Sequence, residues 1–561
     1  MPSRRLDRRR FMAVLGRAGA LLGVAAAGEA LTGCSSGTAG PSGPGTSTST
    51  TGQKKVSGTT EATPGRGRGE KGGAVGLPVA EWVVEENSKA GTTDWLLKGV
   101  GDHVVEGFVD KVSAAAGDKV TLYANTQSRR LDVSLYRLGW YQGKGARLVE
   151  SLGSVEGVRQ RPAGISAGTN MVECRWSPTL SFRVQDDWPT GYYLAKLTTT
   201  GGYAQWAPFV VRDDASRAAV LVQSSVTTWQ AYNLYGGYSL YSSPSGSYAD
   251  RSRIVSFDRP YASGDEDGTA DLFGNEYSLV ALVERLGVDV AYWTDVDLHA
   301  RSSQLANHRC LVSLGHDEYW SAAMRDSCQS ALAKGLNIAF LGANACYRHI
   351  RLDPSPLGPY RHVVCYKVAS EDPLYGKDDA AVTANWPDGP VPRPESQLIG
   401  VEYQAFGGSG DLVIVSPGSW VFSGTGLKQG SRIANSLGSE FDRYVPGPPS
   451  PPNVEILAHS PTSSVIGPSF SDMAYYTVKG GGGVFASGTA AFVDRLWANG
   501  NVLPKPFAPG PVPGATAPIT RITENVLSLF SRGPASATHP SVANWRRFYS
   551  PGSSAPPAVD V

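Results

Sequence analysis

Three titratable side chains follow one another at the end of a predicted strand. The apolar segment 310–314 is typical of a buried strand, and a glycine leads from it to His316, Asp317 and Glu318. Ligands of open α/β sheets bind beyond the carboxyl ends of the strands, so a site is expected at this position. A histidine and a carboxylate two residues apart indicate a site more than a solvated surface, and they suit proton transfer or metal binding. For Asp317 the alternative role is capping of the helix predicted over 321–334.

The turn at Gly315 resembles the strand–glycine–helix elbow that presents the nucleophile in α/β hydrolases and glutamine amidotransferases. Neither a serine nor a cysteine stands at its tip, and Ser321 would have to act from inside the helix. The sequence therefore disfavours a Ser-His-Asp enzyme.

Tyrosines gather after the first predicted strand of the same region. Residues 228–241 contain four tyrosines, among them Tyr232, Tyr235 and Tyr241, and Tyr261 ends a later segment. Most buried tyrosines pack and make one hydrogen bond, so tyrosine alone is weak evidence for a site. Phenolate and carboxylate oxygens are, however, hard anionic donors that suit ferric iron better than zinc or copper. Such a site would absorb visible light.

Two sequence textures divide the body of the chain. Between about residues 79 and 213, short segments with period-2 alternation are separated by turn signals, a pattern that predicts a β-sandwich. From about residue 218 strand-like and helix-like segments alternate, which predicts a mainly parallel sheet covered by helices. The strand-like segments are 218–222, 288–293, 310–314 and 337–341, and the helix-like ones are 276–286 and 321–334.

The predicted fold class is thus mixed, with an N-terminal β-sandwich over 76–214 and an α/β domain over 215–535. A C-terminal tail follows over 536–561. Residues 34–75 are rich in Ser, Thr, Gly and Pro with few apolar side chains, which predicts a disordered tether. Residues 1–33 have the features of an export signal.

That signal has three parts in order. Arg8 and Arg9 fit the twin-arginine pattern, a mildly apolar run follows, and Leu31-Thr-Gly-Cys34 resembles the lipobox of bacterial lipoproteins. Arg17 and Glu29 interrupt the run, and charge is costly in hydrocarbon, so a membrane-spanning helix is not expected. We expect twin-arginine export and a lipid anchor at Cys34 on the outer face of the cytoplasmic membrane. The alternative is an ordinary signal peptide with a chance cysteine.

Charge and cysteine usage limit the partners. The chain has 51 basic and 50 acidic residues, whereas a nucleic-acid partner would require a broad basic surface. Beyond Cys34 five cysteines remain without a CxxC pair, which argues against a zinc cage. Cys346 and Cys365 flank a proline-containing loop and are the expected disulfide.

Several sequence blocks resemble the large-subunit family of N,N-dimethylformamidase. The most specific is Leu314-Gly-His-Asp-Glu-Tyr-Trp-Ser321. The matching blocks run in the expected order over about residues 100 to 500. The other blocks are 229–237, 257–261, 340–346, 440–442 with 458–461, and 471–476 with 485–488.

The resemblance implies a β-sandwich ahead of a glutamine-amidotransferase-like α/β domain. It also implies a mononuclear Fe(III) ion held by two tyrosines and one glutamate, with a histidine two residues before that glutamate. Carried over residue by residue, Glu318 is the ligand, His316 is the histidine, and Tyr232 and Tyr261 are the tyrosines. The tyrosines left open as alternatives are Tyr235, Tyr241 and Tyr277.

The implied activity is iron-dependent hydrolysis of a small linear amide. Ferric iron would act as a Lewis acid while His316 orients a water or shuttles its proton. Glu440 or Asp442 protonates the leaving nitrogen or forms a loop salt bridge. The family enzyme works with a small second subunit, so a second subunit or a homo-oligomer is expected. The family enzyme is not lipid-anchored, so this chain can share its metal site and act on another amide. The alternative function is an inactive lipoprotein that binds a cell-envelope polymer.

Overall fold

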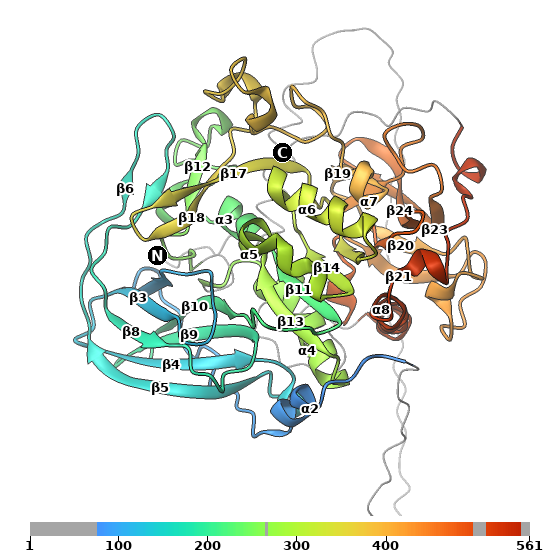
Figure 1. The fold of residues 1–561 in the computed structure, drawn as a ribbon. Helices are drawn as coiled ribbons and strands as arrows, with labels where there is room; N and C mark the ends of the chain where they lie inside the picture. Colours follow the sequence, from blue (N-terminus) through green and yellow to red (C-terminus); the bar gives the residue numbers. More distant parts are fainter. Residues whose placement is uncertain (1–75, 264–267, 497–511, 551–561) are drawn as a thin grey trace, which may run out of the picture. The chain divides into compact units, whose positions relative to one another are not determined.

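The computed structural model describes residues 76–263, 268–496 and 512–550 (Figure 1). The twin-arginine motif, Cys34 and the whole predicted tether lie outside these ranges. Within them no helix has the length and hydropathy needed to cross a membrane.

Two sheets occupy the N-terminal part of the described chain. One has three strands in the order β1-β3-β8, and the other has five in the order β2-β10-β9-β4-β5. Apolar side chains of both sheets form one buried cluster, with Leu122 of β3 and Val133 of β4 fully buried. The strands are β1 (Val105–Val109), β2 (Ser113–Ala114), β3 (Lys119–Thr126), β4 (Arg130–Leu138), β5 (Ala146–Glu156), β8 (Leu180–Arg183), β9 (Gly191–Thr199) and β10 (Ala204–Val211); β6 (Gly164–Ile165) pairs with β7 (Val172–Glu173).

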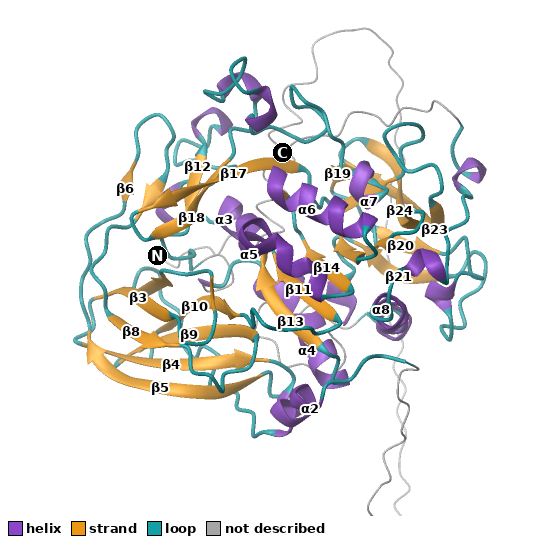
Figure 2. Ribbon diagram, in the orientation of Figure 1, coloured by secondary structure: helices purple, strands orange, loops and turns teal. Residues whose placement is uncertain are grey.

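A seven-stranded sheet follows, in the order β13-β11-β14-β16-β25-β24-β23 (Figure 2). Strands β13, β11, β14, β16 and β25 are parallel to one another, and β24 and β23 complete the sheet antiparallel. Every residue of the first four is buried, as expected for parallel strands covered on both faces. The bounds are β11 (Val220–Ser224), β13 (Val290–Thr294), β14 (Cys310–Gly315), β16 (Asn337–Gly342), β23 (Glu455–Ser464), β24 (Gly467–Thr477) and β25 (Gly483–Ala486).

The predicted helices are present. Helix α4 (Tyr277–Leu286) ends at Gly287, whose φ of 68° is the left-handed conformation that glycine adopts at helix ends. Helix α6 (Ala322–Ala333) starts after Ser321, whose hydroxyl accepts from the backbone N–H of Met324 at 3.3 Å. The others are α2 (Glu81–Ser88), α3 (Val226–Tyr232), α5 (Asp295–Arg301), α7 (Ser396–Ile399) and α8 (Thr516–Phe530).

Ser321 is the residue that caps α6, so the capping role considered for Asp317 is wrong. The Asp317 carboxylate instead accepts hydrogen bonds from Gln223 at 2.7 Å and Ser313 at 2.8 Å. These contacts bind the end of β14 to β11, and Asp317 therefore holds the turn that carries its two neighbours.

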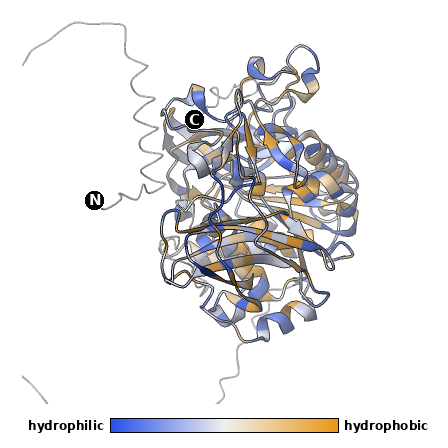
Figure 3. Cartoon of the chain, turned by 90° about the vertical axis from the view of Figure 1, so that its left-hand side faces the viewer, coloured by the Kyte–Doolittle hydropathy of each residue, from blue (hydrophilic) through white to orange (hydrophobic). Residues whose placement is uncertain are grey.

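Smaller sheets surround the seven-stranded one. Strands β12, β18, β17 and β15 form a four-stranded sheet, while β19 pairs with β22 and β20 with β21. In Figure 3 the strands and the helices both carry hydrophobic and hydrophilic residues. The bounds are β12 (Ile254–Ser256), β15 (Tyr319–Ser321), β17 (Arg348–Ser355), β18 (Gly358–Val364), β19 (Glu402–Phe406), β20 (Gly410–Val413), β21 (Arg432–Leu437) and β22 (Glu440–Arg443).

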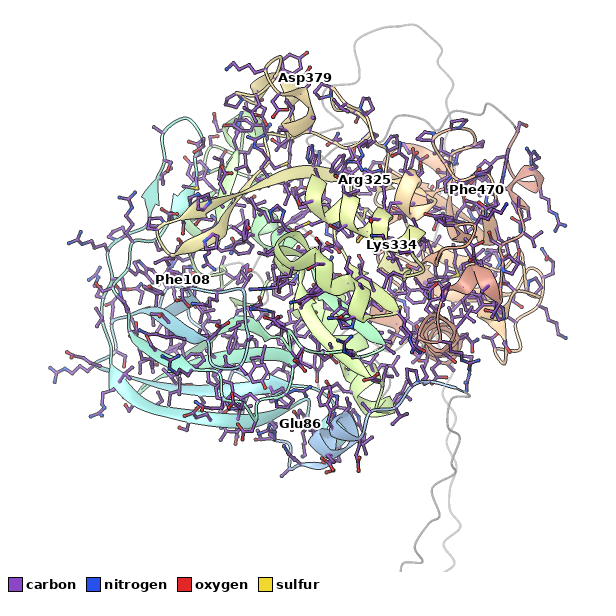
Figure 4. All side chains as sticks on the ribbon, in the orientation of Figure 1. Glu86, Phe108, Arg325, Lys334, Asp379 and Phe470 are labelled. Carbon is purple, nitrogen blue, oxygen red and sulfur yellow. The ribbon has the colours of Figure 1, made fainter. Side chains whose placement is uncertain are left out.

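Buried charges join the N-terminal sheets to the rest. Arg137 of β4 and Glu284 of α4 form a fully buried ion pair at 2.6 Å. Nearby, Glu86 of α2 (labelled in Figure 4) accepts from the Tyr141 hydroxyl at 2.6 Å and Arg147 at 2.7 Å. Burial raises the pKa of Glu86, but the positive charge of Arg137 and these hydrogen bonds outweigh it and lower the pKa to about 2.

One hydrophobic cluster continues from the five-stranded sheet into the seven-stranded one. Leu138 and Trp206 pack in the same cluster as Val220 and Leu314. The predicted domain boundary near residue 214 stays a prediction, because this cluster contains buried side chains from both sides of the boundary.

The structure contradicts the expected disulfide, since Cys346 and Cys365 are free thiols buried in different surroundings. Cys346 lies near Arg325 and Cys328, whereas Cys365 lies near Lys367. The position of the two cysteines on either side of a proline-containing loop was therefore insufficient to predict a disulfide. The intervening strands β17 and β18 direct the two thiols to separate places.

Candidate metal and catalytic site

The carboxyl ends of three parallel strands supply the candidate site. Tyr232 ends helix α3, which follows β11; His316 and Glu318 follow β14; Asn344 follows β16. These strands are neighbours in the sheet, so their ends bring residues more than a hundred positions apart to one edge. The position agrees with the rule that ligands of such sheets bind beyond the carboxyl ends.

Two glycines allow the turn after β14. Gly315 has a φ of 55°, and a Cβ there would stand 2.5 Å from the Asn275 carbonyl oxygen. Its register partner Gly342 is closer still, because a Cβ there would lie 1.8 Å from the Gly315 oxygen. The resemblance to a strand–glycine–helix elbow predicted that the chain would enter α6 directly after this turn, and the structure differs on this point. The short strand β15 intervenes, and it pairs with β17.

Three oxygens meet at the centre of the site. The hydroxyls of Tyr232 and Tyr241 both donate to Oε2 of Glu318, at 2.9 and 3.0 Å, and lie 2.9 Å from each other. Tyr241 also approaches Oε1 of Glu318 at 2.8 Å, and it accepts from the Tyr319 hydroxyl at 2.7 Å. Glu318 is 1% exposed, and Tyr232 is half-buried.

Two cations lie beside these oxygens. Nε of Arg348 donates to Oε1 of Glu318 at 3.0 Å, and Nζ of Lys367 lies 2.9 Å from the centre of the Tyr241 ring. Burial raises the pKa of Glu318, but the hydrogen bond from His316 and the charge of Arg348 outweigh it and hold the pKa well below its ordinary value. Burial and the Glu318 charge raise the pKa of Tyr232 and Tyr241 well above 10. Without a metal the site is therefore a carboxylate bound by two phenols.

His316 links this cluster to a second carboxylate. Its Nε2 lies 3.0 Å from Glu440 and 3.4 Å from Glu318, and its ring centre lies 5.3 Å from that of Tyr232. Burial lowers the pKa of His316, but the negative charge of Glu440 and the hydrogen bond to Glu318 raise it to about 10. The imidazole can therefore hold a proton between two carboxylates. The Asn344 amide approaches the same nitrogen at 3.4 Å.

Asp442 takes part indirectly. It lies two residues beyond Glu440 on β22, and its carboxylate accepts from the backbone N–H of Asn344 at 2.8 Å. Burial raises the pKa of Asp442 to about 7, with the nearby Glu440 charge adding to the effect. Asp442 thus fixes the loop after β16 against β22, whereas Glu440 contacts the imidazole.

The other candidate tyrosines lie elsewhere. Tyr261 is buried with its ring edge-on to Trp229, 6.1 Å between centres, and within the described ranges no hydrogen bond joins it to Glu318. Tyr235 donates to Glu106 at 3.3 Å, and Tyr277 donates to two backbone carbonyls. The structure therefore brings together Tyr232 and Tyr241 and leaves Tyr261 outside. The identity of the ligands stays a prediction.

Sequence reasoning missed Tyr319, Asn344, Arg348 and Lys367. Tyr319 belongs to the most specific block, and Arg348 follows another matching block by two residues, so both could have been considered. Nothing in the sequence around Lys367 singles it out. Its place above the Tyr241 ring depends on the path of the chain after β18.

The donor set of this cluster is unusual for a metal site. Across the described ranges, no group of three His, Cys, Asp or Glu side chains is arranged to hold a metal ion. A site here would need the tyrosine oxygens, and once both phenols are ionised the three oxygens at the centre would be of the hard anionic kind that suits ferric iron.

Comparison with known proteins gives one family. Residues 132–502, about two thirds of the chain, match a family model described as "N,N-dimethylformamidase beta subunit-like, C-terminal". This range contains every residue of the cluster. No curated protein matches the chain.

Two solved structures show short, weak likenesses. A Paenibacillus sp. cycloisomaltooligosaccharide glucanotransferase complexed with cycloisomaltoheptaose is 13% identical over 26% of this chain and 19% of its own, with a TM-score of 0.14. An uncharacterized protein from Bacillus anthracis str. Ames is 12% identical over 23% of this chain and 89% of its own, with a TM-score of 0.11. At such scores neither likeness supports a fold or a function for this chain.

Proposed function

The chain belongs to the N,N-dimethylformamidase beta subunit-like family, and on that premise we propose that it hydrolyses the C–N bond of small linear amides with a mononuclear Fe(III) ion. The observation that carries the proposal is the meeting of the Tyr232 and Tyr241 hydroxyls at one oxygen of the buried Glu318 carboxylate. The family supports amide hydrolysis in general. The iron and its ligands are the finer proposal.

The three oxygens lie close enough together to hold one ion. They form a triangle with sides of 2.9, 2.9 and 3.0 Å. Oxygen ligands that share one small cation stand at about this spacing. Hydrogen bonds between the same groups have similar lengths, so the spacing is compatible with both states. Exchange of the two phenol protons for one cation would need little movement.

With both phenols ionised, Tyr232, Tyr241 and Glu318 would supply three negative charges to a trivalent ion. Arg348 and Lys367 stand outside this triangle and offset the negative charge while the metal is absent. We propose Tyr241 as the second tyrosine ligand in place of Tyr261, because Tyr241 contacts both other donors.

Bound ferric iron would supply Lewis acidity, which polarises an amide carbonyl or acidifies a water. The chain's own residues would handle protons. His316 contacts Glu318 and Glu440, so its Nε2 can pass the proton that it holds to Glu440 and take up another at the site. We assign this relay to His316 and Glu440, which makes Glu440 the group that returns a proton to the leaving nitrogen. Asp442 is a positioning residue, since it holds the backbone of Asn344.

The fold and setting of the enzyme complete the proposal. The two N-terminal sheets with a common core support a β-sandwich, and the parallel sheet supports a glutamine-amidotransferase-like domain. The export motifs in the sequence support twin-arginine transport and a lipid anchor on the outer face of the cytoplasmic membrane. A small second subunit or a homo-oligomer is the proposed assembly.

The deciding experiment measures iron per chain, the visible spectrum and turnover of a small amide on the purified protein. We expect about one iron per chain, a tyrosinate band and hydrolysis. Glu318→Gln should lose the iron and the colour, while the matched variant Glu440→Gln should keep both and lose turnover. A colourless protein that gains neither band nor activity on anaerobic loading with iron and reoxidation would refute the proposal and favour the polymer-binding lipoprotein.

A further inference from the structure

A surface cavity of about 450 Å³ lies at the antiparallel end of the seven-stranded sheet. Residues 418–420, the strands β23 and β24, and residues 538–540 line it. Figure 1 shows β23, β24 and α8 near one another in this part of the fold. The cavity shares no lining residue with the cluster around Glu318, and its inference is independent of the hydrolase proposal.

Aromatic rings form the walls. The indole of Trp420 and the ring of Tyr475 meet at 81° with their centres 5.2 Å apart. The His539 imidazole stands at 66° to the same indole, 5.8 Å away, and Phe530 packs against Trp420 at 5.9 Å. The Tyr475 hydroxyl donates to the His539 carbonyl at 2.6 Å, which fixes the C-terminal segment against β24. Tyr475 is only 1% exposed whereas Trp420 is half-buried, so the indole is the ring open to a ligand and Tyr475 holds it in place.

A carboxylate completes the lining. Glu455 lies directly opposite Tyr475 in the β23–β24 ladder, so both side chains project from the same face of the sheet. Glu455 is half-buried, and its polar neighbours are neutral: the Ser419 hydroxyl and the backbone N–H of Val542. Within the described residues no charged group acts on it. Burial raises the pKa of Glu455, and the two hydrogen bonds, which lower it, do not outweigh burial. This is expected for a carboxylate that has no cationic partner among the described residues.

A partly open indole and a carboxylate whose partners among the described residues are neutral select one class of ligand. Cations are attracted to the negative face of an aromatic ring, most strongly that of Trp, and organic ammonium ions are recognised in this way. Glu455 repels anions, and a neutral ligand would cover the carboxylate without neutralising it, which is unfavourable. We propose that this cavity binds a small organic ammonium ion, with Glu455 as its counter-charge and the Trp420 indole against its alkyl groups.

The test uses the full chain with its tryptophans labelled at the indole nitrogen, at pH 8, where histidine is ordinarily neutral. The Trp420 signal is identified as the one missing from Trp420→Phe, because the chain has 13 tryptophans. Tetramethylammonium chloride is titrated at constant ionic strength. We expect a saturable shift of the Trp420 signal with a dissociation constant on the order of millimolar. The neutral tert-butanol, of similar shape, should produce no saturable shift.

Two variants separate charge from shape. Glu455→Gln keeps the shape and should weaken tetramethylammonium binding about five- to tenfold. Glu150→Gln is the matched control, a half-buried strand glutamate elsewhere on β5, and should change nothing. An unmoved Trp420 signal, equal binding of tert-butanol, or unchanged affinity in Glu455→Gln would each overturn the inference. Iron content and amide turnover should be the same in Glu455→Gln as in the parent, so failure here leaves the proposed hydrolase standing.

Discussion

Replacing Tyr241 by phenylalanine removes one oxygen from the centre of the cluster and leaves the ring in place. That oxygen donates to Glu318 at 2.8 Å and accepts from the Tyr319 hydroxyl at 2.7 Å. Tyr261→Phe is the matched control, since it removes the same atom from a fully buried ring whose hydroxyl interacts with Gln230. Both variants keep the ring volume, so neither change in stability includes a cavity cost.

The two substitutions should differ in magnitude even without metal. In Tyr241→Phe a hydrogen bond to a charged group is lost, worth about 1.5–3 kcal/mol, and the buried Tyr319 hydroxyl loses its acceptor, at a further cost of about 1–3 kcal/mol. Tyr261→Phe should cost about 0.5–1.5 kcal/mol, the value of one neutral hydrogen bond. Urea unfolding of the metal-free proteins measures both changes in the free energy of unfolding.

Iron content separates the variants further. Substituting a group that only orients a metal ligand commonly lowers affinity 10- to 100-fold, and loss of a direct ligand should exceed that. We therefore expect Tyr241→Phe to retain less than about a tenth of the parent's iron after dialysis against a weak chelator and to lose or shift the visible band. Tyr261→Phe should keep its iron and an unshifted band. The opposite pattern, with iron lost from Tyr261→Phe and retained by Tyr241→Phe, would refute the assignment and restore the ligand chosen from sequence.

Other parts of the interpretation make separate predictions. His316→Ala should keep its iron and lower amide turnover about 10²–10⁴-fold, as measured by steady-state kinetics; loss of the iron instead would make the imidazole a ligand. Because the pKa of Glu86 is lowered from 4.5 to about 2, its stabilisation of about 3 kcal/mol is complete above pH 4.5 and is lost as the pH falls toward 2. Glu86→Gln should thus reduce the dependence of the unfolding free energy on pH in that window, and an unchanged slope would contradict the assignment. Cys34→Ser should release the protein from the membrane fraction, and replacement of Arg8 and Arg9 by Lys should leave precursor in the cytoplasm; fractionation and immunoblotting decide both.

Periodicity and position in the sequence determined much of the scaffold. Helix α4 and its end at Gly287, helix α6 and the parallel strands β11, β13, β14 and β16 follow from side-chain patterns within single segments. These patterns are local, because an apolar stripe or a buried strand requires the same residues wherever the segment packs. The position of His316 and Glu318 was predicted in the same way, because the apolar segment before them marks the carboxyl end of a strand. The family assignment also needed only the sequence.

Tertiary structure decided which side chains meet there. Tyr232 and Tyr241 are nine residues apart in a segment with four tyrosines, and only the path of the chain after α3 brings both hydroxyls to Glu318 while Tyr261 packs on Trp229. Arg348 and Lys367 reach the site from the two ends of the β17–β18 hairpin, and the same strands keep Cys346 and Cys365 apart. Such meetings depend on contacts between distant segments, and side chains of the same type at similar spacing can point in different directions. A single sequence without a fold therefore specifies the edge of the sheet where the site lies, and the packing of loops on that edge specifies its members.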